Sequence, residues 1–349
     1  MSTPRRSIVL DAAFTRLAPP TARVERIAGG FHFTEGPVWR GDHLLFSDIP
    51  HSRIVRWQER PEGPEVRTFR VEHASLADPG DMGHCNGMTL DADDRLIVCG
   101  QGARRVTRTE ADGRVTVLAD RYDGKRLNSP NDVVVHASGD IYFTDPPHGL
   151  RSRDEGNELP FQGVYRIAAD GRLHLLVDDM THTNGLAFSP DQRVLYIGDD
   201  VRGHVRAFDV RADGSLNDGR VFAATPLPET LDPDEGPPDG MKVDRAGHLY
   251  VTSIGGVWVF DPSGKPLGVI AVPEQPSNVA WGDQDWRTLF ITARTSLYRI
   301  RLAAPGLPVG RAAQGIHRQD ADAPGHTGHT LMTPGDSAHG SPPGPRSRS

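Results

Sequence analysis

Short apolar runs bounded by polar turn residues recur along the first 300 residues of the chain. They are rich in β-branched and aromatic side chains, as in Leu44–Phe46, Leu96–Val98, Ile141–Phe143, Val194–Ile197, Leu249–Val251 and Leu289–Ile291. Asp-Gly and Ser-Gly pairs lie between many of these runs, and no stretch before residue 300 keeps a 3.6-residue period. The pattern therefore predicts an all-β sandwich, barrel or propeller with little helix.

Internal repetition selects among these β architectures. Six segments share one order of features: a polar residue, an apolar strand, a turn containing Asp or Gly, and a second apolar strand. They read EGPVWRGDHLLFSD from Glu35, NGMTLDADDRLIVCG from Asn86, NDVVVHASGDIYFTD from Asn131, NGLAFSPDQRVLYIGD from Asn184, DGMKVDRAGHLYVTS from Asp239 and NVAWGDQDWRTLFIT from Asn278. Their mean spacing of about 49 residues is typical of four-stranded propeller blades. The sequence thus predicts a six-bladed β-propeller.

The two ends of the chain differ from this pattern. After Ile300 the sixth blade lacks an outer strand, and the segment Arg23–Ile27 is the candidate to supply it and to close the ring. From Ala303 the sequence is rich in Pro, Gly, Ser, His and Arg and poor in apolar residues, which predicts a disordered tail. We therefore expect an N-terminal extension over 1–20, the propeller over 21–302 and the tail over 303–349.

Composition and charge narrow the classes of function. The chain carries 39 Lys+Arg against 46 Asp+Glu, a formal net charge of −7, which argues against a nucleic-acid partner. No apolar run approaches the ~18–20 residues of a membrane-spanning helix, and the stretch Ile8–Leu10 is too short for a signal-peptide core. These features predict a soluble, cytoplasmic protein that is a monomer or a weak homo-oligomer.

The first residue of each repeat is the strongest chemical signal. In a propeller the inner strands start together at one end of the axis, so these six side chains should converge there: Glu35, Asn86, Asn131, Asn184, Asp239 and Asn278. All six offer oxygen, and two carboxylates so close together would repel each other without a cation. Oxygen ligands favour Ca²⁺, followed by Mg²⁺ or Mn²⁺, and Zn²⁺ is a further candidate. The alternative is that these residues only form turns.

Several motifs also resemble a known family. TEGPVW from Thr34, LNSPNDVVV from Leu127, NGLAFSPD from Asn184 and PDGMKVD from Pro238 are similar to the gluconolactonase, senescence-marker-protein and luciferin-regenerating-enzyme family, and YDGKRLNSPND and IYFTDPPHGL resemble its bacterial gluconolactonase branch. The likeness runs from about Asp11 to Leu302. It implies a six-bladed propeller with one axial divalent metal that hydrolyses sugar lactones. The implied metal ligands are Glu35, Asn131, Asn184 and Asp239, whereas Asn86 and Asn278 lie outside the usual set.

Residues on loops near these positions are candidates for substrate binding: Arg126, Asn128, Asn86, His148 and His182. The family resemblance favours the loop that carries Arg126 and Asn128, and Arg126 could bind hydroxyls or a developing oxyanion; the alternative is a surface arginine paired with Asp123. Two positions depart from the family pattern. Thr183 replaces a common Pro, which we expect to change loop stiffness only, and His148 replaces a common Tyr, which bears on the substrate more than on the reaction.

Lactone hydrolysis requires a polarised carbonyl and an activated water. We expect Asp239 to act as general base, or else only as a structural ligand, and Glu35 to balance the charge of the metal. Two alternative functions stay open. The same site could hydrolyse another lactone or ester, or the protein could be a non-enzymatic binding platform with a structural metal. The sequence has no G-x-S-x-G elbow for a serine nucleophile.

Overall fold

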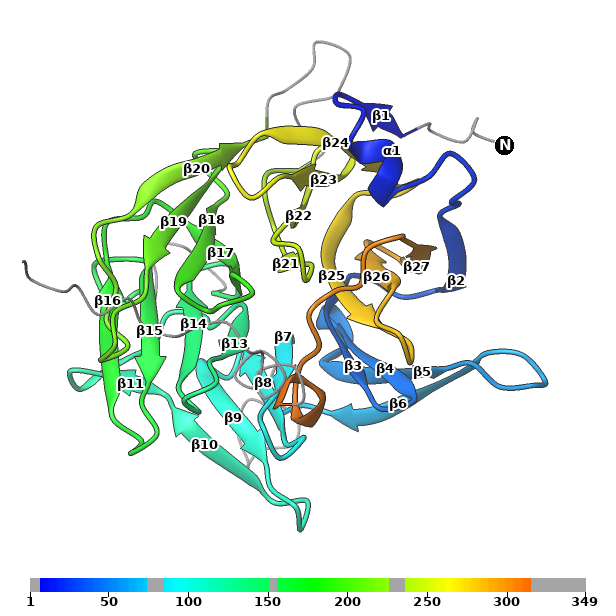
Figure 1. Ribbon diagram of the computed structural model, residues 1–349. Coiled ribbons are helices and arrows are strands. Elements are labelled where there is room, and N and C mark those ends of the chain that lie inside the picture. Colours follow the sequence, from blue (N-terminus) through cyan, green and yellow to red (C-terminus); the bar gives the residue numbers. More distant parts are fainter. Residues whose placement is uncertain (1–6, 74–83, 151–155, 226–235, 315–349) are drawn as a thin grey trace, which may run out of the picture.

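The computed structural model describes residues 7–73, 84–150, 156–225 and 236–314. Within these ranges six antiparallel sheets surround a central axis (Figure 1), so the predicted six-bladed β-propeller is confirmed. Helices are a minor component, as expected: α1 spans Phe14–Leu17, and a 3₁₀ turn spans Ile49–His51. No helix in the described ranges is long and apolar enough to cross a membrane.

Blades 1 to 4 have four consecutive strands each, and blades 5 and 6 each include one strand from the N-terminal segment. Blade 1 contains β3 (Thr34–Arg40), β4 (His43–Asp48), β5 (Arg53–Gln58) and β6 (Glu65–Val71). Blade 2 contains β7 (Cys85–Leu90), β8 (Leu96–Gly100), β9 (Arg105–Thr109) and β10 (Val115–Ala119). Blade 3 contains β13 (Val133–Val135), β14 (Ile141–Asp145), β15 (Gly163–Ile167) and β16 (Leu173–Val177).

The remaining blades follow the same order from the axis outward. Blade 4 contains β17 (Thr183–Phe188), β18 (Val194–Asp199), β19 (His204–Asp209) and β20 (Arg220–Ala224). Blade 5 contains β21 (Met241–Val243), β22 (Leu249–Ser253), β23 (Gly256–Phe260) and β24 (Pro266–Ala271). Blade 6 contains β25 (Pro276–Gly282), β26 (Thr288–Ala293) and β27 (Ser296–Arg301). A small hairpin of β11 (Arg121–Tyr122) and β12 (Lys125–Arg126) lies between blades 2 and 3 in the chain.

The N-terminal segment completes two blades. As predicted, β2 (Glu25–Gly29) is the outer strand of blade 6 and pairs antiparallel with β27, with Glu25 opposite Arg299. The sequence did not predict that β1 (Ile8–Val9) pairs with β24 as a fifth strand of blade 5. The part of the N-terminal extension that the structure describes therefore belongs to the propeller, because β1 covers a sheet edge and α1 buries Phe14 against the core.

Large aromatic side chains fill the space between neighbouring blades. Trp39 of blade 1 stacks on Phe290 of blade 6, with ring centroids 5.2 Å apart. Trp281 of blade 6 meets Tyr250 of blade 5 edge-on at 5.0 Å. Such pairs add to the hydrophobic burial that holds flat sheets together face to face. The core is therefore a ring of inter-blade clusters around the axis.

The segment that follows β27 is ordered through Gln314, whereas the sequence predicted disorder from Ala303. It crosses the propeller from blade 6 to blade 2 (Figure 1, orange). The N–H of Arg245 donates to the Pro305 carbonyl at 3.0 Å, and the N–H of Arg311 donates to Oδ1 of Asp94 at 2.8 Å. We call residues 303–314 the strap. The rest of the predicted tail, 315–349, and residues 1–6 lie outside the described residues.

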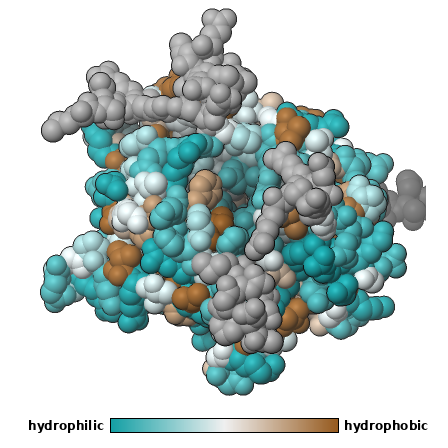
Figure 2. All heavy atoms as spheres, turned by 180° about the vertical axis from the view of Figure 1, so that it is seen from behind, coloured by the Kyte–Doolittle hydropathy of each residue, from teal (hydrophilic) through white to brown (hydrophobic). Residues whose placement is uncertain are grey.

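The two ends of the propeller axis carry different parts of the blades. We call the end of the axis where the inner strands begin the upper end. The opposite end, where the inner strands turn into the second strands and the strap lies, is the lower end. Figure 2 shows the upper end, with a hollow near its centre among mostly hydrophilic residues. The six repeat-starting side chains belong to this upper end.

Candidate functional site

Close approach of the inner strands places the repeat-starting residues around the axis. The N–H of Gly87 donates to the Asn131 carbonyl at 2.8 Å, so neighbouring inner strands are hydrogen-bonded across the blade boundary. A Cβ on Gly36 would lie 2.1 Å from the Asn86 carbonyl oxygen, and one on Gly185 would lie 2.3 Å from that of Asp239. Glycine is therefore required at these two positions, which explains the pairs Glu35-Gly36 and Asn184-Gly185.

Contacts across the axis link the first, third and last blades. Glu35, Asn131 and Asn278 are all buried. The Asn278 amide donates to Oε2 of Glu35 at 3.1 Å and lies 3.4 Å from Oδ2 of Asp132. The Lys242 ammonium is 4.0 Å from that same Asp132 oxygen. The structure thus assembles Glu35 and Asp132 within one polar cluster, which we call the axial cluster.

Asp239 and Asn184 join this cluster from blades 5 and 4. The Asp239 carboxylate accepts a hydrogen bond from the Asn184 side chain and lies close enough to Glu35 for the two charges to interact. Asn184 is buried, and its Nδ2 also lies 3.4 Å from Oδ2 of Asp200. Of the four residues implied as metal ligands, Glu35, Asn184 and Asp239 are thus brought together, and Asn131 lies on the neighbouring inner segment, where its backbone carbonyl accepts from Gly87.

Burial and mutual repulsion raise the pKa values of Glu35 and Asp239. Loss of solvent and the negative charge of Asp132 raise the pKa of Glu35 to about 8. Loss of solvent raises the pKa of Asp239 well above its ordinary value, and Glu35, Asp200 and Asp132 add to the effect. A cation between these groups would remove the penalty by favouring their charged forms.

The donor set fits a divalent metal. Among the repeat-starting residues, all of which the structure describes, three have a buried side-chain oxygen without a hydrogen-bond partner: Oε1 of Glu35, Oδ1 of Asn86 and Oδ1 of Asn184. Buried oxygens without partners are costly unless an ion or water satisfies them. They are acceptors only, which suits a hard cation such as Ca²⁺. Asn86 thus contributes to the site region, although the family resemblance does not place it among the usual ligands.

The predicted substrate loop contains one exposed and one buried candidate. Arg126 is exposed and forms an ion pair with Glu158, whose Oε2 also accepts the Arg126 backbone N–H at 2.7 Å. Its partner is therefore Glu158 and not the expected alternative, Asp123. Asn128 has no exposed surface, and its amide donates to the carbonyls of Asp145 and Phe161 at 3.0 and 2.9 Å. The structure thus places Asn128 beneath the loop, where it supports the backbone.

The two candidate histidines meet at a carboxylate that the sequence did not single out. Nε2 of His148 is 2.8 Å from Oδ2 of Asp200, and Nδ1 of His182 is 3.3 Å from Oδ1 of the same residue. The two imidazole rings are edge-on, with centroids 5.2 Å apart. The ligand atoms of the three side chains all lie within 4.8 Å of one another, so they could hold a metal ion. We call them the histidine cluster.

The repeat pattern does not point to Asp132 or Asp200, because neither is the first residue of a repeat. Asp132 directly follows Asn131, and Asp200 directly follows the second strand of blade 4. In an antiparallel hairpin the end of the second strand lies beside the start of the first. Asp-Asp at 199–200 was therefore an available signal that this end of blade 4 carries extra negative charge.

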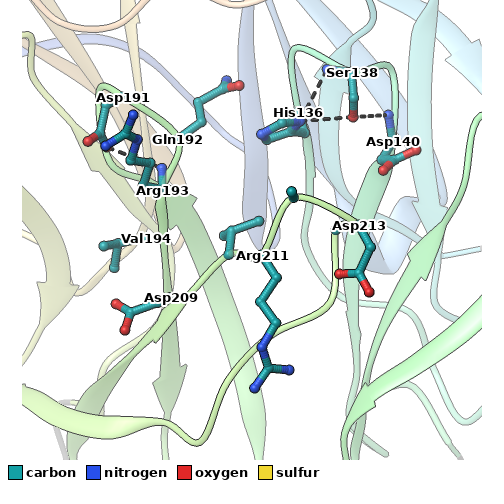
Figure 3. A pocket seen from close by; sticks show the side chains of 13 residues that line it. His136, Ser138, Asp140, Asp191, Gln192, Arg193, Val194, Asp209, Arg211 and Asp213 are labelled. Atoms are coloured by element: carbon teal, nitrogen blue, oxygen red, sulfur yellow. Dashed lines mark hydrogen bonds between the residues drawn. The ribbon is translucent and has the colours of Figure 1, made fainter. Parts of the chain in front are cut away.

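A separate pocket of about 610 Å³ lies at the lower end between blades 3 and 4 (Figure 3). Its polar side chains come from hairpin turns and largely satisfy each other locally. Oδ1 of Asp191 accepts from Ser189 at 2.7 Å, and Oδ1 of Asp213 accepts the backbone N–H of Ser215 at 2.9 Å. This pocket is thus an inter-blade hollow lined by turn residues, and it contains none of the predicted site residues.

Fold and site together match one protein family. Residues 33–295 match the model described as the SMP-30/Gluconolactonase/LRE-like region. The chain belongs to this family, as its motifs predicted.

Individual relatives cover most of the chain. A gluconolactonase from Zymomonas mobilis is 34% identical over 316 residues, covering 86% of this chain and 84% of its own. A solved gluconolactonase structure from Xanthomonas campestris is 38% identical with a TM-score of 0.73, covering 86% of this chain and 95% of its own. A pentonolactonase from Haloferax volcanii is 28% identical, and the match covers 80% of this chain and 94% of the relative.

Proposed function

We propose that the protein hydrolyses sugar lactones, converting an aldonolactone to its aldonic acid, with a divalent cation bound in the axial cluster. The observation that carries the proposal is the convergence of Glu35, Asn184 and Asp239 on one end of the axis, with unpartnered oxygens among them. The relatives named gluconolactonase and pentonolactonase support the lactonase class.

The proposed metal ligands are Glu35, Asn131, Asn184 and Asp239. They combine two carboxylates with two neutral amide oxygens, a set that Ca²⁺ accepts readily because it tolerates irregular oxygen coordination. Mg²⁺, Mn²⁺ and Zn²⁺ are the other candidates. Glu35 would mainly balance the charge of the ion, since Asn278 already holds its Oε2.

The proposed mechanism assigns each residue one task. The metal, when bound, polarises the lactone carbonyl and lowers the pKa of water. The Asp239 carboxylate takes the proton from the attacking water, and the hydrogen bond from Asn184 orients that carboxylate. The water oxygen bonds to the carbonyl carbon, the ring C–O bond breaks, and the leaving oxygen takes up the proton that Asp239 received, which gives the hydroxyl of the aldonic acid.

Substrate hydroxyls would meet polar side chains around the upper end. Arg126 is exposed there on β12, and His148 and His182 lie beside the axial cluster through Asp200. Asn86 has a free Oδ1 that suits a hydroxyl or a metal-bound water. Asn128 would act by holding the loop in place, because its side chain is buried.

A pH-indicator assay tests this proposal. Metal-loaded protein is mixed with glucono-, galactono-, xylono- and arabinonolactones, and acid release is compared with the spontaneous rate before and after chelation. We expect release well above background with at least one lactone, loss of activity on chelation and recovery when Ca²⁺ is restored. Acid release no faster than background with every lactone would instead favour a metal-stabilised binding platform, and turnover of simple esters alone would point to a different substrate class.

A further inference from the structure

We propose that His148, His182 and Asp200 form a second metal site, distinct from the axial cluster, that binds a transition-metal ion of the Zn²⁺ class. The inference does not depend on the proposed lactonase activity. It rests on two imidazole nitrogens and one carboxylate whose ligand atoms all lie within 4.8 Å of one another.

The spacing of the three groups suits a small ion. Zn²⁺ bonds nitrogen and oxygen at about 2.0–2.1 Å, so neighbouring ligands in a tetrahedral site are about 3.3 Å apart. The contacts that Asp200 makes with His148 and His182 measure 2.8 and 3.3 Å. Movements of a few tenths of an ångström would therefore admit the ion. Three protein ligands leave a fourth position for water or an exogenous group, as in catalytic zinc sites.

Two of the three ligands are fixed by the backbone of blade 4. His182 directly precedes β17, Asp200 directly follows β18, and the N–H of Asp200 donates to the His182 carbonyl at 3.1 Å. The two residues are thus opposite each other across an antiparallel strand pair. The amide of Asn184, 3.4 Å from Oδ2 of Asp200, helps to orient the carboxylate from outside the cluster.

The third ligand comes from the loop after β14, and that loop is anchored at this point. The N–H of Gly149 donates to Oγ of Ser129 at 2.8 Å, and a Cβ on Gly149 would lie 2.3 Å from that same oxygen. The sequence Pro-Pro-His-Gly therefore holds the backbone of His148 against the neighbouring loop. Its imidazole keeps about a quarter of its surface exposed, which leaves a path for an ion to enter.

The chemistry of this cluster differs from that of the axial cluster. Oxygen-only ligands favour Ca²⁺ and Mg²⁺, whereas imidazole nitrogen favours Zn²⁺, Co²⁺ and Ni²⁺. Two metal sites of different preference are thus adjacent, and Asn184 contacts a carboxylate in each. Ca²⁺ in excess should fill the axial cluster without filling the histidine cluster.

Cobalt provides a direct test that does not use activity. The full-length protein is stripped of metal, saturated with Ca²⁺ and titrated with Co²⁺ while its visible absorption is recorded. We expect one Co²⁺ per chain with the spectrum of nitrogen coordination, displaced by one equivalent of Zn²⁺. His148→Tyr and His182→Gln should each weaken Co²⁺ binding at least ~10-fold, the lower bound reported for disturbing even the supporting shell of a metal site.

Two controls separate this site from other histidines. His248→Gln removes a comparable pair at the lower end, where Nδ1 lies 2.9 Å from Oδ2 of Asp244, and should leave Co²⁺ binding unchanged. Replacing His317, His326, His329 and His339 by Gln should do the same. The proposal is overturned if no Co²⁺ binds beside Ca²⁺, or if the signal survives in both His148→Tyr and His182→Gln. Thermal unfolding of each variant establishes that it is folded.

Discussion

The side-chain amide of Asn278 donates a 3.1 Å hydrogen bond to Oε2 of Glu35, although 243 residues separate the two along the chain. Glu35 belongs to the first blade and Asn278 to the last. Their contact exists only because the ring is closed, with the outer strand of blade 6 supplied by the N-terminal segment. The geometry of the axial cluster thus depends on the closure of the propeller.

Removal of the Asp239 carboxylate tests the axial cluster. We expect Asp239→Ala to abolish Ca²⁺ binding in calorimetry and to lower lactone turnover by about 10²–10⁴-fold, the range for loss of a general base, or further because the metal is lost as well. Asp209→Ala changes an exposed carboxylate at the lower end and should affect neither quantity. Near-normal hydrolysis by Asp239→Ala would refute the assignment of this site.

The pH dependence of metal-free protein tests the electrostatics. The pKa of Glu35 is raised to about 8 in the folded chain, so folding favours its protonated form. The stabilisation from this group is fully present below its ordinary pKa of about 4.5 and is lost as the pH rises towards 8. Thermal unfolding between pH 5 and 9 should show wild type losing stability relative to Glu35→Gln. With saturating Ca²⁺ the trend should disappear for wild type, whereas parallel curves without metal would contradict the prediction.

Substitution of two glycines in blade 1 distinguishes the cost of backbone strain from the cost of crowding at the axis. Both Gly36 and Gly41 have positive φ, at 55° and 68°, but a Cβ on Gly41 meets nothing within 4 Å, whereas one on Gly36 meets the Asn86 carbonyl. Gly41→Ala should therefore cost only the ~1–2 kcal/mol of left-handed backbone. Gly36→Ala should cost more and also weaken Ca²⁺ binding, because Glu35 is displaced. Equal losses in denaturant unfolding would show that crowding at the axis is unimportant.

Truncation tests the strap. Chains ending at residue 302 and at residue 314 differ only by the strap, in which Leu307 and Val309 are partly buried against the clusters of blades 4–5 and 1–2. A fully buried aliphatic side chain contributes about 1.5–3 kcal/mol. Because Leu307 and Val309 are only partly buried, and because ordering the strap costs conformational entropy, we expect the shorter chain to be about 2 kcal/mol less stable. Identical melting temperatures for the two truncated proteins would mean that the strap adds nothing to stability.

The sequence was sufficient to predict the blades but not the segments attached to them. The strands repeat one alternation of apolar and turn residues, so their number and order could be read directly. β1 has only two residues, Ile8 and Val9, and too short a pattern to be recognised. The strap was missed because it has few apolar residues, and those it has gain partners only when the ring brings blades 5 and 2 beneath it.

The sequence predicts those residues of the candidate site that lie at the start of an inner strand. Glu35, Asn184 and Asp239 were identifiable because each begins a repeat. Asp200 acts beside them from the end of a second strand, and Asn128 is buried by a loop whose path the sequence does not specify. Ion pairs between distant segments, such as Arg126 with Glu158, also depend on how loops of different length fold back.

The pairing of β2 with β27 has a consequence for how the protein is made. Strand β2 leaves the ribosome long before its partner in blade 6, β27 (residues 296–301), is synthesised. Blades 1 to 4 contain only consecutive strands and can form in turn, but blade 6 cannot be completed until β27 has been synthesised. Glu35 meets Asn278 only after blade 6 has been synthesised, so the nascent protein acquires its candidate metal-binding capacity only once all six blades have been made.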